Sequence, residues 1–200
     1  MAEDALDRAF RRLPDAAVKW PSKTTQEDWA KLTNAKEPLV HGVFGFVDGK
    51  NYRVQSLSNV DLQNAQYDCW LHCVFVTVCL CFGVDGTIIW ARHNCPGSWN
   101  DGAMSRSLQA RMADDRRVAP GIKVASDSAF PVAGRCAGRI ITPLKECDLE
   151  RHPHSQRAAL HTMSDCITSL RQAVEWEMGD AGNVYRQLMH PLTYNPVVRG

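Results

Sequence analysis

Hydrophobic residues in this chain gather into short runs with two kinds of spacing. Strand-like apolar runs occur at residues 43–47, 73–82, 87–92, 121–126 and 139–142. A Gly-Val-Asp-Gly turn separates the second run from the third, and this arrangement is typical of a β-hairpin. The first and fourth runs lead directly into Asp48 and Asp127. The pattern therefore predicts a hairpin together with short strands, two of which are followed directly by an aspartate.

Helical spacing follows the hairpin and dominates the last third of the chain. Met104, Leu108 and Met112 recur every four residues, which predicts a helix that begins near Asn100 or Asp101. A single long apolar stripe with spacings of three or four consists of Leu160, Met163, Ile167, Leu170, Val174 and Met178. Shorter helices are expected at residues 5–12, 26–32 and 184–189.

The order of these elements predicts an α/β fold. We expect an RNase H-like mixed sheet, with three antiparallel strands plus parallel strands, flanked by helices. Residues 1–40 are polar and interrupted by prolines, and should form an N-terminal segment with short helices. The main domain is expected at 41–192. Residues 193–200 are expected to be a truncated tail, because PLTYNPVVRG carries no terminating pattern.

Composition narrows the class of protein. A hydrophobic fraction of 44% with six tryptophans supports a sizeable core, and a charged fraction of 22% is ordinary for a globular chain. The longest apolar stretch, 73–82, is too short to span a bilayer, and no apolar leader opens the chain. We therefore expect an intracellular protein with no membrane partner. The net charge of +1 does not by itself indicate a nucleic-acid binder.

The eight cysteines allow two interpretations. Cys79 and Cys81 alternate within an apolar run, which predicts inward-facing strand positions. A zinc cluster is the alternative, with ligands available from Cys69, His72, Cys73, His93 and Cys95. Core packing is favoured over zinc because the chain has no C-x-x-C pair.

Acidic residues at the ends of apolar runs suggest a metal site. If the strands before Asp48 and Asp127 are parallel neighbours, their carboxylates emerge together and require a hard cation such as Mg²⁺ to neutralise them. Glu175, on the long helix, and Asp101, at the start of the earlier helix, could add ligands, with Arg171 one turn before Glu175 orienting it or pairing with it. Taken singly, these acids have ordinary alternatives: a turn, a helix cap and a solvated helix residue.

Five segments of the chain resemble one known family. GFVDGKNY, NCPGSWNDGAM, VASDSAFP, GRIITPL and SLRQAVEWEM are similar, in this order, to blocks of the DDE superfamily endonuclease domain of PIF/Harbinger-type transposases. The resemblance implies an RNase H-like fold, divalent-metal binding and cleavage of DNA phosphodiesters. It assigns Asp48, Asp127 and Glu175 as catalytic residues and metal ligands, Asp101 as a fourth metal ligand, and Arg171 as a supporting residue.

Two functional hypotheses follow. The first is a metal-dependent DNA endonuclease or transposase domain that uses Mg²⁺ or Mn²⁺ to cleave or join phosphodiesters by a two-metal mechanism. The second is a catalytically inactive, transposase-derived module that binds DNA or protein. We expect DNA as the partner, a nuclear location, and either a separate DNA-binding protein or a homodimer as a further partner.

Overall fold

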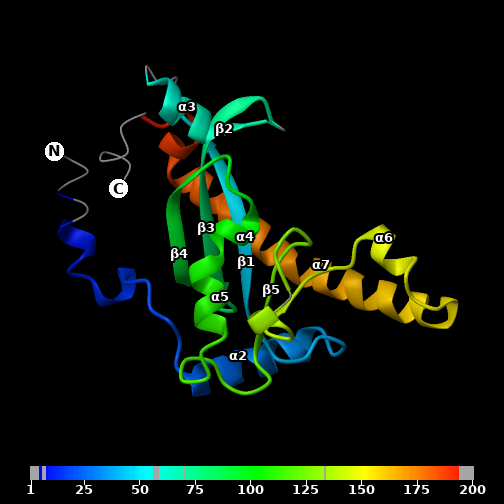
Figure 1. Ribbon diagram of the computed structural model, residues 1–200. Helices are drawn as coiled ribbons and strands as arrows, with labels where there is room; N and C mark the ends of the chain where they lie inside the picture. The colour runs from blue at the N-terminus through cyan, green and yellow to red at the C-terminus, as the bar shows by residue number, and fades with distance from the viewer. Residues whose placement is uncertain (1–4, 6–7, 56–58, 70, 133, 194–200) are drawn as a thin grey trace.

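A six-stranded mixed sheet forms the centre of the molecule (Figure 1). The computed structural model describes every residue except 1–4, 6–7, 56–58, 70, 133 and 194–200, so the tail predicted at 193–200 lies almost entirely outside the described residues. The strands are β1 (Val43–Arg53), β2 (Tyr67–Asp68), β3 (Cys73–Gly83), β4 (Ile88–Pro96), β5 (Lys123–Ala125) and β6 (Ile140–Ile141). Their order is β2-β3-β1-β5-β6, with β4 also paired to β3.

The pairing directions confirm the predicted fold class. β1, β3 and β4 are antiparallel neighbours, whereas β5 and β6 run parallel to β1 on its other side. The β3–β4 hairpin closes through Gly83–Thr87, where the backbone N–H of Gly83 donates to the carbonyl of Thr87 at 2.8 Å. Gly86 has a φ of +81°, a conformation that glycine adopts without steric cost.

Helices cover both faces of this sheet (Figure 1). On one face, α2 (Lys23–Lys36), α4 (Asp101–Met104) and α5 (Arg106–Met112) enclose a core that includes Phe44, Val47, Cys79, Cys81, Leu108 and Met112. On the other face, α7 (His154–Val184) packs Ile167, Leu170, Val174 and Met178 against Val43, Phe46 and Ala125. The inward positions predicted for Cys79 and Cys81 are confirmed, since both side chains are fully buried.

β1 is longer than the sequence suggested. The apolar run was expected to end on Asp48, with a polar connection from residue 51 to 66. Instead, pairing with β3 continues through Asn51 and Tyr52 to Arg53. Thr77 donates a hydrogen bond of 2.6 Å to the side chain of Asn51, and Tyr52 is buried, so polar sequence here still forms strand. The rest of the connection includes α3 (Val60–Gln66).

The predicted helices are present with altered bounds. The helix that starts near Asp101 is interrupted at Ser105, whose hydroxyl donates to the carbonyl of Asp101. The helix expected at 184–189 is divided, because α7 continues to Val184 and a 3-10 turn, η3 (Arg186–Met189), follows. Of the helix expected at 5–12, residues 5 and 8–10 are helical and 6–7 are not described. No helix in the described part of the chain is both long and apolar enough to cross a membrane.

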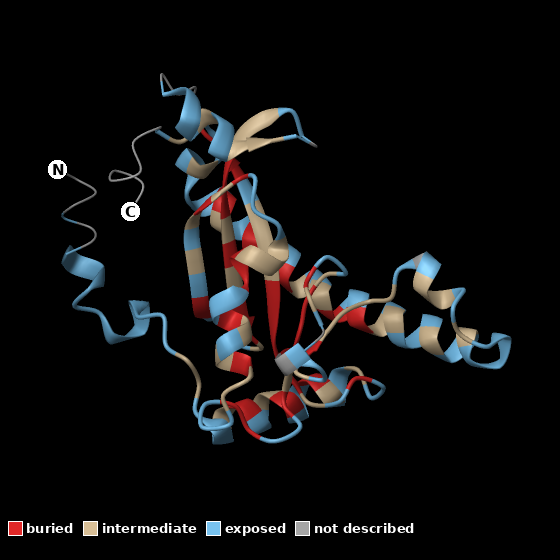
Figure 2. Ribbon diagram, in the orientation of Figure 1, coloured by how far each residue is buried: buried red, intermediate tan, exposed pale blue. Residues whose placement is uncertain are grey.

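The first half of α7 extends away from the sheet together with α6 (Glu146–Leu149) (Figures 1 and 2). The buried part of the apolar stripe starts only at Ile167, whereas Met163 remains 40% exposed. The periodic pattern therefore predicted the helix correctly, but burial against the sheet applies only to its second half.

The polar N-terminal segment also contributes to the core. Gln26 on α2 is completely buried and its side-chain amide donates to the carbonyls of Pro21 and Arg117 at 3.0 and 2.7 Å. The backbone N–H of Ala119 donates back to Gln26 Oε1 at 3.1 Å. Trp20 packs edge-on against Phe44 with ring centroids 5.6 Å apart. These contacts fix α2 against the loop that leads into β5.

Candidate metal centre

Asp48 lies in the middle of β1, opposite Leu80 of β3. It is placed beside the end of β5, because β5 pairs with β1 only as far as Phe46 and Ala125. Asp48 and Asp127 each lie two residues beyond that last parallel pair. The expected parallel neighbourhood is therefore confirmed, although the position of Asp48 inside a strand corrects the expectation that its strand ends there.

The environment of Asp48 disfavours its charged form. Burial raises the pKa of Asp48, and the charges of Asp127 and Glu175 raise it further. Two groups oppose this: the backbone N–H of Gly49, which donates to Oδ1 at 2.9 Å, and the guanidinium of Arg171, whose Nη2 lies 3.7 Å from Oδ1. Burial is the largest of these effects, so the charged form of Asp48 is only partly compensated by Gly49 and Arg171.

Asp127 occupies a turn at the end of β5. Its Oδ1 accepts a hydrogen bond of 2.8 Å from the backbone N–H of Ala129, which fixes the orientation of the carboxylate. Its charge acts on two other acids, raising the pKa of both Asp48 and Asp101. Asp127 is therefore an electrostatic neighbour of both Asp48 and Asp101.

Asp101 approaches from the opposite face of the sheet. A Cβ atom built on Gly49 would lie 3.6 Å from Asp101 Oδ1, so the carboxylate stands over that glycine. The N-cap of α4 is Asn100, whose side chain accepts from the N–H of Ala103 at 2.9 Å. Asp101 is thus not needed as the helix cap, and burial followed by the charge of Asp127 raises its pKa.

Glu175 and Arg171 lie one turn apart on the buried half of α7. Glu175 is exposed, but its charge contributes to raising the pKa of Asp48. Arg171 is mostly buried, and its Nε has no hydrogen-bond partner among the described residues. The structure therefore places Arg171 against Asp48, where the sequence had suggested Glu175 as its partner.

The donor chemistry of these acids fits a hard divalent cation. Carboxylate oxygens are the ligands that Mg²⁺ and Mn²⁺ prefer, and uncompensated anions gain most from such an ion. Within the described residues, however, no three His, Cys, Asp or Glu side chains are gathered tightly enough to ligate one ion as they stand. The carboxylates are electrostatic neighbours that an ion would have to draw together.

The zinc alternative requires Cys and His side chains that lie close together. No metal-holding group of Cys and His occurs in the described part of the chain. Cys95 is buried in the core and Cys69 is exposed, so these two potential ligands face different environments. The favoured interpretation of Cys95, core packing, is confirmed.

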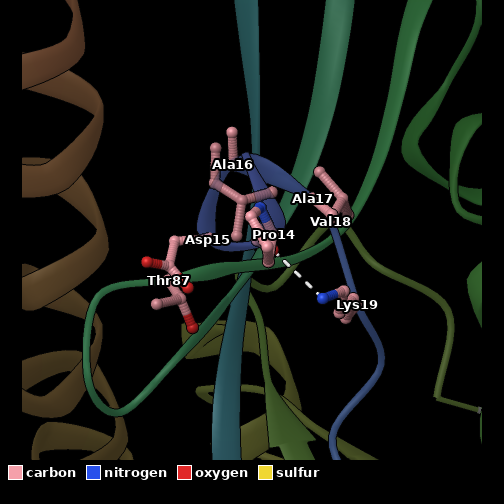
Figure 3. Close-up of a pocket in the computed structure, with 8 residues that line it drawn as sticks. Pro14, Asp15, Ala16, Ala17, Val18, Lys19 and Thr87 are labelled. Carbon is pink, nitrogen blue, oxygen red and sulfur yellow. Dashed lines mark hydrogen bonds between the residues drawn. The ribbon is translucent and has the colours of Figure 1, made fainter. Parts of the chain in front are cut away.

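A separate cavity of about 550 Å³ lies between residues 14–19 and the β3–β4 turn (Figure 3). Lys19 spans part of it, donating to the carbonyl of Pro14 at 3.0 Å. Of the described residues that line it, Asp15 is the one carboxylate. This cavity shares no lining residue with the acidic cluster.

Lys50 is a neighbour of the acids that the sequence did not single out. It follows Asp48 by two residues and projects from the same face of β1, and its Nζ donates to the carbonyl of Met178 on α7 at 2.8 Å. Side chains alternate along a strand, so the position of Lys50 two residues after Asp48 could have indicated that both lie on one face.

Comparison with known proteins gives one family match. A family model described as DDE superfamily endonuclease matches residues 47–198, which is most of the chain. The chain belongs to the DDE superfamily endonucleases. This family carries out nuclease or transposase chemistry on DNA and generally uses divalent metals. No curated protein and no solved structure matches the chain. The roles of individual site residues stay predictions.

Proposed function

We propose that this DDE superfamily endonuclease is the catalytic domain of a PIF/Harbinger-type transposase that cleaves or joins DNA phosphodiesters with Mg²⁺ or Mn²⁺. Asp48, Asp127 and Glu175 would be the catalytic ligands, Asp101 an auxiliary ligand and Arg171 a supporting residue. The observation that carries the proposal is the placement of Asp48 and Asp127 at the same level of two parallel strands. Their charges interact with those of Asp101 and Glu175.

Each residue has a defined task in this proposal. Asp48 and Asp127 present oxygens from rigid backbone, since the N–H groups of Gly49 and Ala129 hold their carboxylates. Glu175 projects from α7 on the Asp48 side, and Asp101 approaches from the α4 side. Bound divalent cations would activate the attacking oxygen and stabilise the leaving oxygen of the phosphodiester. Water or a DNA 3′-hydroxyl is the nucleophile, so no side chain forms a covalent intermediate.

Arg171 supports this site by partial neutralisation. Its guanidinium lowers the pKa of Asp48, which keeps more of that carboxylate ionised and available as a ligand. At 3.7 Å the contact is loose, and it leaves Asp48 free to accept further partners. A nuclear location and a partnership with a DNA-binding protein or a second copy of the chain are part of the proposal.

A supercoiled plasmid provides the test. The wild type should convert it to nicked or linear DNA in Mg²⁺ or Mn²⁺, and Asp127→Asn should lose at least about 100-fold in rate, because a ligand of the reacting centre is removed. Asp28→Asn is the matched control, since Asp28 is an exposed aspartate on α2 that pairs with Lys31. Equal cleavage by the wild type and Asp127→Asn would contradict the site assignment.

The second candidate is a catalytically inactive module. Two observations favour it: the net charge of +1, and the absence of a tight metal-holding group among the described residues. Calorimetry separates the two functions. An active domain binds Mn²⁺ saturably and loses that binding in Asp48→Asn, whereas an inactive module shows no Asp48-dependent binding.

A further inference from the structure

A groove lined by basic residues lies beside the second half of β1. It lies between the second half of β1 and η3, and its volume is about 240 Å³. Lys50, Arg53 and His190 line it, and an adjoining cavity of about 420 Å³ adds Arg186. The two cavities share Gly182, Met189 and His190, so they form one surface, which we call the β1–η3 groove.

The β1 residues that line the groove have one edge without a strand partner among the described strands. β5 leaves β1 after Phe46, and the next contact on that side is the bridge between Val54 and Leu192. Leu192 donates to the carbonyl of Arg53 at 2.8 Å and accepts from the N–H of Gln55 at 2.9 Å. Because hydrogen-bonding directions alternate along a strand, the N–H groups of Gly49 and Asn51 point to this same edge. The N–H of Gly49 accordingly donates to the side chain of Asp48 rather than to a strand.

The charge of the groove is of one sign. No carboxylate is among the described residues that line either cavity. None of the ion pairs between described residues involves Lys50, Arg53 or Arg186. Lys50 bonds a neutral carbonyl, that of Met178, so its charge is not cancelled by this contact. The positive charges are therefore available to an anion.

Two of the residues around the groove are close in sequence to members of the acidic cluster. Lys50 follows Asp48 on the same face of β1, and Met178, its acceptor on α7, lies one turn after Glu175. At about 3.3 Å per residue, the path along β1 from Asp48 to Arg53 covers about 17 Å. Alternation puts the Arg53 side chain on the opposite face of β1 from Lys50, and Arg53 belongs to the groove as one of the residues that line it. A duplex strand places a phosphate roughly every 3.4 Å along its axis, so several consecutive phosphates span that path.

We propose that the β1–η3 groove binds the phosphate backbone of the DNA next to the bond that is cut. Lys50, Arg53 and Arg186 make the phosphate contacts, and they hold the strand so that the neighbouring phosphodiester lies at the carboxylates. The contacts are to backbone, so the groove positions DNA without reading its sequence. This inference rests on the proposed function, since it names the path of that substrate.

Salt-dependent binding of a short fluorescent DNA duplex in EDTA tests the groove without cleavage. Each lost phosphate contact reduces the slope of log affinity against log salt by about 0.9, so Arg53→Gln and Arg186→Gln should each show that loss and the double variant about twice as much. Lys50→Gln should behave likewise. Lys36→Gln is the control, because Lys36 is exposed on α2, at the other end of the sheet from η3 (Figure 1).

The outcomes are separable from those of the plasmid assay. Slopes equal to the wild type in the three single variants and the double variant overturn the proposal, as does tighter binding of an RNA duplex of the same length. Circular dichroism checks that each variant is folded. If Lys50→Gln unfolds, the variants of Arg53 and Arg186 still test the proposal, because both side chains are exposed. A chain that fails to cut plasmid while its groove variants still lose slope would contradict the proposed function and leave the groove standing. A wild type that cuts plasmid while the groove variants keep the wild-type slope would contradict the groove proposal and leave the proposed function standing.

Discussion

Arg171 Nη2 lies 3.7 Å from Asp48 Oδ1, across the interface between α7 and β1. The Arg171 side chain is 12% exposed and that of Asp48 is 21% exposed, so water screens this pair only in part. One cation faces a carboxylate whose other charged neighbours, Asp127 and Glu175, are anions. This imbalance is the main electrostatic property of the site, and it gives the first two predictions.

Asp48→Asn should stabilise the metal-free protein at neutral pH. The folded-state pKa of Asp48 is raised above its ordinary value of 3.8, so the folded protein binds a proton more readily than the unfolded chain does. The wild type is therefore penalised at a pH above the raised pKa, and the penalty disappears as the pH falls to about 3.8. Urea unfolding in EDTA at pH 7 and pH 4 measures it. A variant less stable than the wild type at pH 7 would contradict the prediction.

Arg171→Met should raise the pKa of Asp48 further, because the variant keeps a long apolar side chain and removes the nearby cation. Carbon-detected NMR titration of the Asp48 carboxyl, in EDTA, follows this directly. A double-mutant cycle with Asp48→Asn should give a coupling of about 0.5–2 kcal/mol at pH 7. An unchanged Asp48 pKa would show that the guanidinium does not act on this carboxylate.

Gln26→Ala should destabilise the fold by about 2–4 kcal/mol. The substitution leaves the buried N–H of Ala119 without its partner, at about 1–3 kcal/mol. It also removes the hydrogen bonds to the carbonyls of Pro21 and Arg117, at about 0.5–1.5 kcal/mol each, although Trp20 still donates to Arg117. Gln172→Ala on the exposed surface of α7 is the control and should change stability by less than about 0.5 kcal/mol. Equal stability of the two variants would mean that α2 is not anchored through Gln26.

The cysteines should divide by reactivity. Burial strongly raises the pKa of Cys79 and of Cys81, so neither side chain forms a thiolate in the folded protein at neutral pH. Cys69 and Cys147 are exposed and should react first with a thiol reagent such as Ellman's. Mass mapping after brief labelling measures this order, and full denaturation should release Cys79 and Cys81. Their rapid labelling in the native protein would contradict the placement of β3 in the core.

Much of the fold could be predicted from hydrophobic spacing. The β3–β4 hairpin, the buried Cys79 and Cys81, and the parallel relation of the strands before Asp48 and Asp127 all follow from local pattern and strand order. The errors fall where tertiary pairing overrides local polarity. Asn51 has a polar side chain, yet it belongs to β1 because Thr77 on β3 satisfies it.

The candidate site divides in a similar way. The order of motifs in the sequence identified the four acids. It did not show on which face of the sheet each acid lies. Asp101 stands over Gly49 on one side of the sheet, whereas Arg171 meets Asp48 on the other. Which residue compensates Asp48 depends on how α7 rotates against β1, and helical periodicity alone fixes only which side of the helix is apolar.

The sequence by itself indicated the β3–β4 hairpin, the short strands before Asp48 and Asp127 and the long helix, because each depends on spacing between residues close in the chain. The resemblance to the family, rather than spacing, singled out Asp101 and Glu175 as further candidate ligands. The tertiary structure decided that the charge of Asp127 acts on both Asp48 and Asp101, that Arg171 meets Asp48 rather than Glu175, and that Lys50 reaches the carbonyl of Met178 on α7. Those relations join residues far apart in the chain, and they depend on where β5 stops pairing with β1 and on how α7 crosses the sheet.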